Sequence, residues 1–154
     1  MCIRDRPLID RIAADSRRPA GLILAPTREL ACQIVDEVQS ICNERALSVA
    51  AVYGGVGIQA QAKRAARAHI VVATPGRLED LLQRGAISLK HVRVLVLDEA
   101  DRMLDMGFKP AVDRIVSKVP AGRQTLFFSA TLEGAVGKVA NCLLYTSPSP
   151  RDRS

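Results

Sequence analysis

The chain has 154 residues, of which 48% are hydrophobic and 25% are charged, a composition typical of one soluble globular domain. No apolar run approaches the roughly 18 residues that a membrane span requires, and no apolar stretch follows the basic start, so the sequence predicts neither a transmembrane helix nor a secretory signal. The net charge of +6 favours a polyanionic partner without identifying it.

Short apolar runs alternate with segments of helical periodicity along the chain. The apolar runs predict strands at residues 21–25, 49–53, 70–73, 92–97 and 125–128. The periodic segments predict one helix capped by Thr27 and further helices at 59–68, 77–84, 100–106, 110–119 and 133–141. Continuous apolar strands that alternate with helices predict an α/β fold with an open, mostly parallel sheet and helices on both faces.

Polar residues follow each predicted strand, where parallel sheets bind their ligands. These five segments are Pro26-Thr27-Arg28-Glu29, Gly54-Gly55, Thr74-Pro75-Gly76-Arg77, Asp98-Glu99-Ala100-Asp101 and Ser129-Ala130-Thr131. Because the carboxyl ends of parallel strands lie at one edge of the sheet, the sequence predicts a single site built from five loops.

Asp98 and Glu99 follow the most apolar predicted strand. A carboxylate at that place can hold Mg²⁺ through water, because Mg²⁺ is usually bound by one or two carboxylates together with substrate phosphates. A second carboxylate beside it can orient and deprotonate an attacking water. An isolated Asp-Glu pair would instead indicate an acidic first helical turn. With Asp101, three acids within four residues favour a site for nucleoside triphosphate hydrolysis.

Residues 96–108, Val-Leu-Asp-Glu-Ala-Asp-Arg-Met-Leu-Asp-Met-Gly-Phe, resemble the signature of the DEAD-box ATP-dependent RNA helicases. The other four polar segments match that family in order, and the resemblance covers nearly all of residues 7–141. It implies a RecA-like domain that uses ATP and Mg²⁺ and binds RNA through its backbone, with little sequence specificity. The resemblance therefore implies coupling of ATP hydrolysis to RNA binding and local duplex unwinding.

The family's roles transfer to the matching positions of this sequence. Asp98 would bind Mg²⁺ through water and Glu99 would act on the hydrolytic water. Asp101 would hydrogen-bond with Ser129 and Thr131 and couple nucleotide state to strand separation. The residues that would face the RNA backbone are Pro26, Thr27, Arg28, Gly54, Gly55, Thr74, Pro75, Gly76 and Arg77. Without the family match, helix capping would explain Ser129 and Thr131 equally well, and ordinary turn chemistry would explain Gly54-Gly55 and Pro75-Gly76. Surface ion pairs are the alternative explanation for Arg28 and Arg77.

The sequence contains no Gly-x-x-x-x-Gly-Lys-Ser/Thr loop, which the family places upstream of Pro26. We therefore expect an incomplete first RecA-like domain that cannot hydrolyse ATP by itself. In the family's sheet, strand 125–128 lies beside the strand that ends at Asp98, so its other edge would be exposed here. Two alternatives remain: a DNA-directed superfamily 2 translocase, which the Ser129-Ala130-Thr131 segment disfavours, and a non-catalytic RNA-binding scaffold, which Asp98-Glu99 disfavours.

Both ends of the chain differ in character from the rest. After Leu143 no strand or helix periodicity survives, and two prolines disfavour a helix. A DNA word that can encode residues 1–5, read on the opposite strand in another frame, gives Cys-Leu-Leu-Tyr-Thr, the sequence of residues 142–146. It resembles the transposon-end adaptor of sequencing libraries. Residues 1–6 and 142–154 are therefore expected to be non-native, with a natural basic tail as the alternative.

The two cysteines inside residues 7–141, Cys32 and Cys42, fall within one predicted helix. They lack Cys-x-x-Cys spacing and a histidine cluster, so the sequence predicts neither a zinc site nor a disulfide partner. A reducing, cytoplasmic location follows as the simplest expectation.

Overall fold

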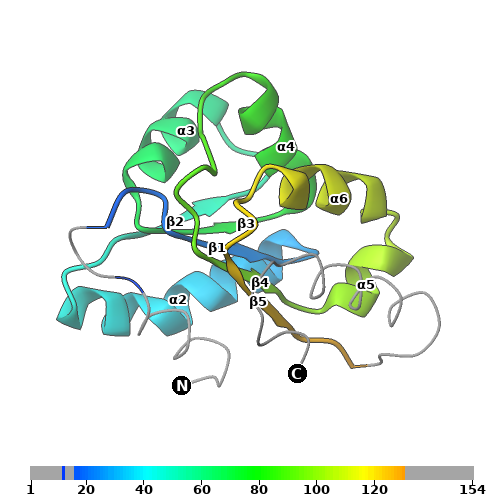
Figure 1. Ribbon diagram of the computed structural model, residues 1–154, viewed down its shortest axis with the longest axis horizontal. Helices are drawn as coiled ribbons and strands as arrows, with labels where there is room; N and C mark the ends of the chain where they lie inside the picture. Colours follow the sequence, from blue (N-terminus) through cyan, green and yellow to red (C-terminus); the bar gives the residue numbers. More distant parts are fainter. Residues whose placement is uncertain (1–11, 13–15, 131–154) are drawn as a thin grey trace.

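The computed structural model describes Ile12 and residues 16–130 as one five-stranded sheet flanked by helices (Figure 1). The strands are β1 (Gly21–Leu24), β2 (Val49–Val52), β3 (Ile70–Ala73), β4 (Val94–Leu97) and β5 (Gln124–Phe127). The helices are α2 (Arg28–Glu44), α3 (Ile58–Arg67), α4 (Pro75–Gln83), α5 (Ala100–Asp105) and α6 (Lys109–Ser117). Thr131, the expected helix at 133–141 and both terminal segments lie outside the described residues.

The sheet is parallel throughout, with the strand order β2-β3-β1-β4-β5. The predicted open α/β fold is confirmed. The expected neighbour of β5 is confirmed as well, because β5 pairs with β4 from Gln124 opposite Val94 to Phe127 opposite Leu97. Within the described part of the chain, the other edge of β5 has no strand partner, and its four residues are only half-buried.

Helices cover both faces of the sheet, because successive side chains of a strand point to opposite sides. Ile23 of β1 packs toward Ile34 in the core that α2 covers. Its neighbour Leu22 belongs to the second core, which includes Leu78 of α4 and Ile115 of α6. Figure 1 shows the same arrangement, with α2 below the sheet and α3, α4 and α6 above it. Burial on both faces explains why the strands are continuously apolar.

The strand order places a topological switch point between β1 and β4. The chain leaves β1 for β2 at one edge of the sheet and leaves β4 for β5 at the other edge. The ends of β1 and β4 are adjacent, since the Asp98 N–H donates to the Leu24 carbonyl at 2.9 Å. In open parallel sheets, ligands bind in the crevice that forms where neighbouring connections diverge in this way.

The start of α4 differs from the prediction. Thr74-Pro75-Gly76 was predicted to be a loop, with the helix beginning at Arg77. This prediction is wrong, because α4 begins at Pro75 with Thr74 as its N-cap. Proline suits the first helical position, since its fixed φ is already helical and its missing N–H would have no partner within the helix. The first turn of α4, including Gly76 and Arg77, therefore lies on the rim of the sheet.

A bidentate ion pair fastens α4 to α6. The Arg114 side chain donates from Nε and Nη2 to the Glu79 carboxylate, and the Nη2 to Oε1 distance is 3.0 Å. This hydrogen bonding holds the pKa of Glu79 below its ordinary value. The pair joins two helices on the same face of the sheet and fixes the position of α4. No helix in the described part of the chain is long and apolar enough to cross a membrane.

Candidate nucleotide and nucleic-acid site

The predicted site residues lie along the carboxyl edge of the sheet, and the strand order separates them into two groups. The segments after β2, β3 and β1 contain the residues that were expected to face RNA. The segments after β4 and β5 contain the acidic residues and Ser129. We call the first group the basic half of the rim, comprising residues 26–28, 53–56 and 74–77. We call the second the acidic half, comprising residues 98–101 and 129–130.

Asp98 occupies the switch point itself. Asp98 follows β4 directly, and the residue is only 5% exposed although its side chain is ionisable. Burying an ionised carboxylate is costly unless other groups compensate its charge. A cation bound at the carboxyl end of this parallel strand is one group that can contribute to such compensation.

The backbone of Glu99 is in the left-handed helical region, with φ 50° and ψ 51°. This conformation costs an L-residue with a side chain roughly 1–2 kcal/mol. Glycine would adopt it without that cost. The Glu99 side chain is 42% exposed and lies 3.5 Å from Arg102, between Oε1 and Nη1. Strained backbone of this kind concentrates at functional sites, although Ala46, which lies outside the predicted site, also has a positive φ of 58°.

Ser129 closes the acidic half of the rim by capping α5 from the neighbouring strand segment. Glu99, the N-cap residue of α5, makes no side-chain capping hydrogen bond. Instead the Asp101 N–H donates to Ser129 Oγ at 3.2 Å, and the Ala100 N–H donates to the Phe128 carbonyl at 3.1 Å. The structure thus joins Asp101 and Ser129 through the Asp101 main chain rather than through its carboxylate.

Arg28 connects two loops of the basic half. It begins α2, and its guanidinium carbon lies 4.8 Å from the centre of the Tyr53 ring, which follows β2. A cation at this distance is attracted by the face of an aromatic ring. Gly55 has φ +89°, and a Cβ added there would lie 3.2 Å from Arg28 Nη1. Gly55 therefore provides both the left-handed turn and the space that the arginine occupies.

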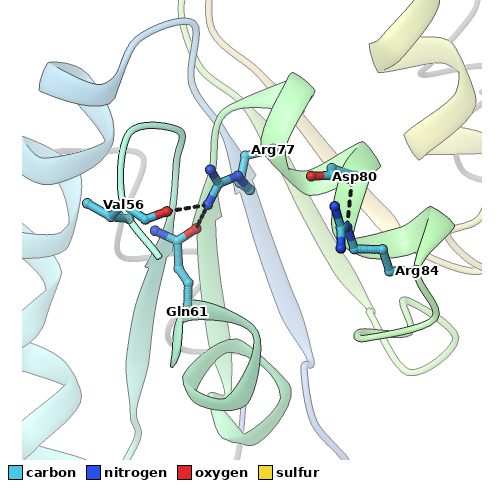
Figure 2. Close-up of polar contacts among 5 residues, drawn as sticks. All are labelled: Val56, Gln61, Arg77, Asp80 and Arg84. Atoms are coloured by element: carbon cyan, nitrogen blue, oxygen red, sulfur yellow. Dashed lines mark hydrogen bonds and ion pairs between the residues drawn. The ribbon is translucent and has the colours of Figure 1, made fainter. Parts of the chain in front are cut away.

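Arg77 makes a second connection to the same loop (Figure 2). Its Nη1 donates to the Val56 carbonyl at 3.1 Å and to Gln61 Oε1 at 3.1 Å. Gln61 Oε1 also accepts from the Tyr53 N–H at 3.2 Å. Gln61 is 2% exposed although it lies on the surface helix α3. The loop after β2 thus contacts Arg28, Arg77 and Gln61.

The remaining predicted residues of the basic half have mainly structural surroundings. The Thr27 hydroxyl accepts from the Leu30 N–H at 3.2 Å and caps α2, as the sequence predicted. Pro26 and Pro75 are buried, whereas Gly54 and Gly76 are exposed. A Cβ added at Gly54 or Gly76 would meet no atom within 4 Å, so both positions are open to solvent.

Sequence reasoning missed Gln61, Tyr53 and the main-chain carbonyl of Val56. Gln61 falls in the Ala-rich segment 59–68, which was predicted to be a helix without any role for Gln61. Its side chain is buried by contacts with the β2 loop and with α4, which lie 8 and 16 residues away in sequence. The one available signal was a glutamine between alanines at a position where helical periodicity places the inner face.

Two buried polar residues lie at the amino ends of the strands and stabilise the fold. His69 Nδ1 accepts from the Ser48 N–H at 3.0 Å and so ties the start of β3 to that of β2. Arg123 Nε donates to Thr125 Oγ1 at 3.1 Å, and burial lowers the pKa of its guanidinium. Both residues lie at the amino ends of strands, away from the rim that carries the predicted site.

The donor set of the acidic half fits Mg²⁺. Within the described residues, no group of three or more His, Cys, Asp or Glu side chains could enclose a metal ion. Asp98 instead offers one buried carboxylate directly after β4. Mg²⁺ keeps several waters and is usually bound by one or two carboxylates plus substrate phosphates, so a site with a single protein carboxylate is compatible with this ion.

Comparisons with known proteins agree with this geometry. A family model described as DEAD/DEAH box helicase matches residues 5–139. A protein of Streptococcus pneumoniae named DEAD-box ATP-dependent RNA helicase CshA is 44% identical over 134 residues, which are 86% of this chain and 26% of that protein. DEAD-box ATP-dependent RNA helicase 40 of Arabidopsis thaliana is 52% identical over 132 residues, 84% of this chain and 12% of that protein.

Solved structures show the same likeness. The crystal structure of a DEAD box protein from Methanococcus jannaschii superposes with a TM-score of 0.83 at 38% identity, covering 93% of this chain and 38% of that one. A hypothetical ATP-dependent RNA helicase from Sulfolobus tokodaii superposes with a TM-score of 0.76 at 39% identity, covering 80% of this chain and 38% of that one. The chain thus spans about a quarter or less of these curated relatives and well under half of these solved chains.

Proposed function

This chain belongs to the DEAD/DEAH box helicase family, and we propose that it is part of an ATP-dependent RNA helicase that couples ATP hydrolysis to RNA binding and local duplex unwinding. The observation that carries the proposal is the division of the rim. Residues suited to phosphate hydrolysis follow β4 and β5, and residues suited to a polyanion follow β2, β3 and β1. Two ligands can therefore bind the same edge of one sheet side by side.

ATP binds at the acidic half in this proposal. Asp98 would hold Mg²⁺ through water, and Glu99 would orient and deprotonate the hydrolytic water. Mg²⁺ held by Asp98 would supply positive charge that stabilises the negative charge of the phosphates during hydrolysis. The burial of Asp98 and the strained backbone of Glu99 support these roles. Because the sequence contains no phosphate-binding loop, we propose that this chain does not hydrolyse ATP by itself.

RNA binds at the basic half, through its backbone. Exposed glycines allow a strand to approach closely, and a helix start offers main-chain N–H groups to phosphates. The first turn of α4 supplies both features next to Arg77. Arg28 and Gly55 supply a second contact area on the neighbouring loops. Contacts of this kind position RNA without reading its bases, so we propose little sequence specificity.

Residues 7–141 form part of the first RecA-like domain in this proposal, and residues 1–6 and 142–154 are non-native. The limits of the family match, residues 5 and 139, lie close to these boundaries. We also propose a cytoplasmic location. Cys32 and Cys42 carry thiols, as expected in a reducing compartment.

Replacing Arg77 by glutamine is expected to weaken binding of a single-stranded RNA oligonucleotide about tenfold or more. The reason is that hydrogen bonds to charged groups contribute about 1.5–3 kcal/mol. The logarithm of the association constant should also fall less steeply with the logarithm of the salt concentration. The slope should change by about 0.7, which is the contribution of one phosphate contact in single-stranded nucleic acid. Fluorescence anisotropy of the full-length protein that contains this chain, at several salt concentrations, measures both quantities.

Arg84→Gln is the matched control, because it removes the same charge from the other end of α4. The Arg84 side chain is 61% exposed and pairs with Asp80 at 3.0 Å, as Figure 2 shows. Exposed pairs of this kind contribute little. Affinity and salt slope should therefore stay near those of the unmodified protein. Equal losses for both variants would place RNA elsewhere on the surface.

A further inference from the structure

Gln61 accepts hydrogen bonds from two residues of the basic half. Its Oε1 receives one hydrogen bond from the Tyr53 N–H at 3.2 Å and one from Arg77 Nη1 at 3.1 Å. These bonds connect three elements, since Tyr53 follows β2, Gln61 lies in α3 and Arg77 lies in the first turn of α4. The glutamine itself is 2% exposed, so it cannot contact a large ligand directly.

We propose that Gln61 is a positioning residue for RNA binding, acting through Arg77; this inference rests on the proposed function. Arg77 Nη1 has two N–H groups, and Gln61 Oε1 and the Val56 carbonyl receive them. Nε and Nη2 make no hydrogen bond to any residue in the described part of the chain. The inward contacts therefore fix the guanidinium plane and leave its Nε–Nη2 edge available for the two oxygens of a phosphate.

A neutral acceptor suits this role better than a charged one. A carboxylate at the same place would form an ion pair with Arg77 and would cancel the charge that attracts phosphate. An apolar side chain of similar size would leave the Tyr53 N–H without its acceptor and would free the arginine to adopt other rotamers. Glutamine satisfies both donors and preserves the full positive charge of the guanidinium.

The same interaction ties the loop after β2 to the start of α4. Gln61 binds Tyr53 and Arg77 together, and Tyr53 in turn lies against Arg28. One buried amide thus sets the relative position of the two arginines that flank the Gly55 turn. Preorganisation of this kind raises affinity by lowering the cost of ordering side chains upon binding.

The test is RNA affinity and its salt dependence for Gln61→Glu, alone and combined with Arg77→Gln, in the full-length protein. A labelled single-stranded oligouridylate serves as the probe. Gln61→Glu should weaken binding about tenfold or more and make the salt slope shallower by about 0.7, as loss of one phosphate contact requires. In the Arg77→Gln background, Gln61→Glu should cause no further loss, because both changes remove the same contact.

Gln59→Glu is the matched control, since it makes the same change at an exposed position two residues earlier in α3. It should leave affinity and slope nearly unchanged. Gln61→Met provides a second measurement: it should weaken binding while keeping the slope, because Arg77 retains its charge but loses its orientation. Wild-type affinity in Gln61→Glu, or additive losses in the double variant, would overturn the inference. If the unmodified protein does not bind the oligouridylate, the proposed function itself fails, and the inference with it.

Discussion

Replacing Glu99 by glutamine in the full-length protein that contains this chain is expected to leave ATP binding intact and to slow phosphate release by about 10²–10⁴-fold, the usual contribution of a general base. The substitution keeps the size and hydrogen-bonding shape of the side chain and removes its proton-accepting charge. The left-handed backbone of Glu99 is no worse for glutamine than for glutamate, so the fold should persist. Nucleotide binding and single-turnover phosphate release, measured on the same preparation, separate the two effects.

Asp105→Asn controls for the loss of a negative charge near the site. Asp105 is exposed at the end of α5, the helix that follows Glu99. This variant should release phosphate at close to the unmodified rate. Turnover of Glu99→Gln within about tenfold of the unmodified protein would assign Glu99 a structural role, since general bases contribute typically 10²–10⁴.

Replacing Ser129 by alanine should uncouple unwinding from hydrolysis. Ser129 Oγ is the acceptor for the Asp101 N–H, while the adjacent bond from the Ala100 N–H to the Phe128 carbonyl does not depend on the side chain. The variant thus loosens one link between the segments after β4 and β5 and leaves Asp98 and Glu99 intact. Coupling energies between sites are typically 1–3 kcal/mol, so duplex unwinding should fall about 5–150-fold with a much smaller change in ATP hydrolysis.

Ser117→Ala is the corresponding control at the end of α6, where the hydroxyl donates to the Arg114 carbonyl at 2.6 Å. It deletes the same hydroxyl hydrogen-bonding group far from the rim and should change neither activity. Strand displacement of a short labelled duplex and phosphate release are measured in parallel. If Ser129→Ala lowers both activities equally, the contact supports the nucleotide site itself rather than its coupling to RNA.

The sheet could be predicted because its determinants are local. Residues of β1 and β4 form uninterrupted apolar runs, and such runs between helical segments indicate strands that are buried on both faces. Because a polar segment follows each predicted strand, these segments could be assigned to the carboxyl ends of the strands, which form the rim. Errors in element bounds were small: β5, for example, spans Gln124–Phe127 rather than 125–128. The predicted start of α4 was two residues late because Thr74-Pro75-Gly76 was assigned to the loop after β3, although Pro75 is well suited to a first helical position.

The finer geometry of the site depends on tertiary contacts that no local pattern encodes. Nothing in the sequence around Glu99 indicates a left-handed backbone, which arises where β4 must turn into α5. Likewise, Gln61 resembles any polar residue of a surface helix until the β2 loop and α4 close over it. The sequence analysis expected a hydrogen bond between Asp101 and Ser129. It did not predict that the donor would be the main-chain N–H of Asp101.

The most direct test of the proposed function is phosphate release from ATP by the full-length protein with Mg²⁺, compared without nucleic acid, with single-stranded RNA and with DNA of the same sequence. The proposed function, an RNA-stimulated ATPase, predicts that RNA accelerates release, that DNA does so far less, and that Glu99→Gln abolishes the RNA-stimulated rate. Equal or greater stimulation by DNA would identify a DNA-directed translocase instead. RNA binding without any phosphate release would identify a non-catalytic scaffold, and either result would contradict an RNA-stimulated ATPase built on this sheet.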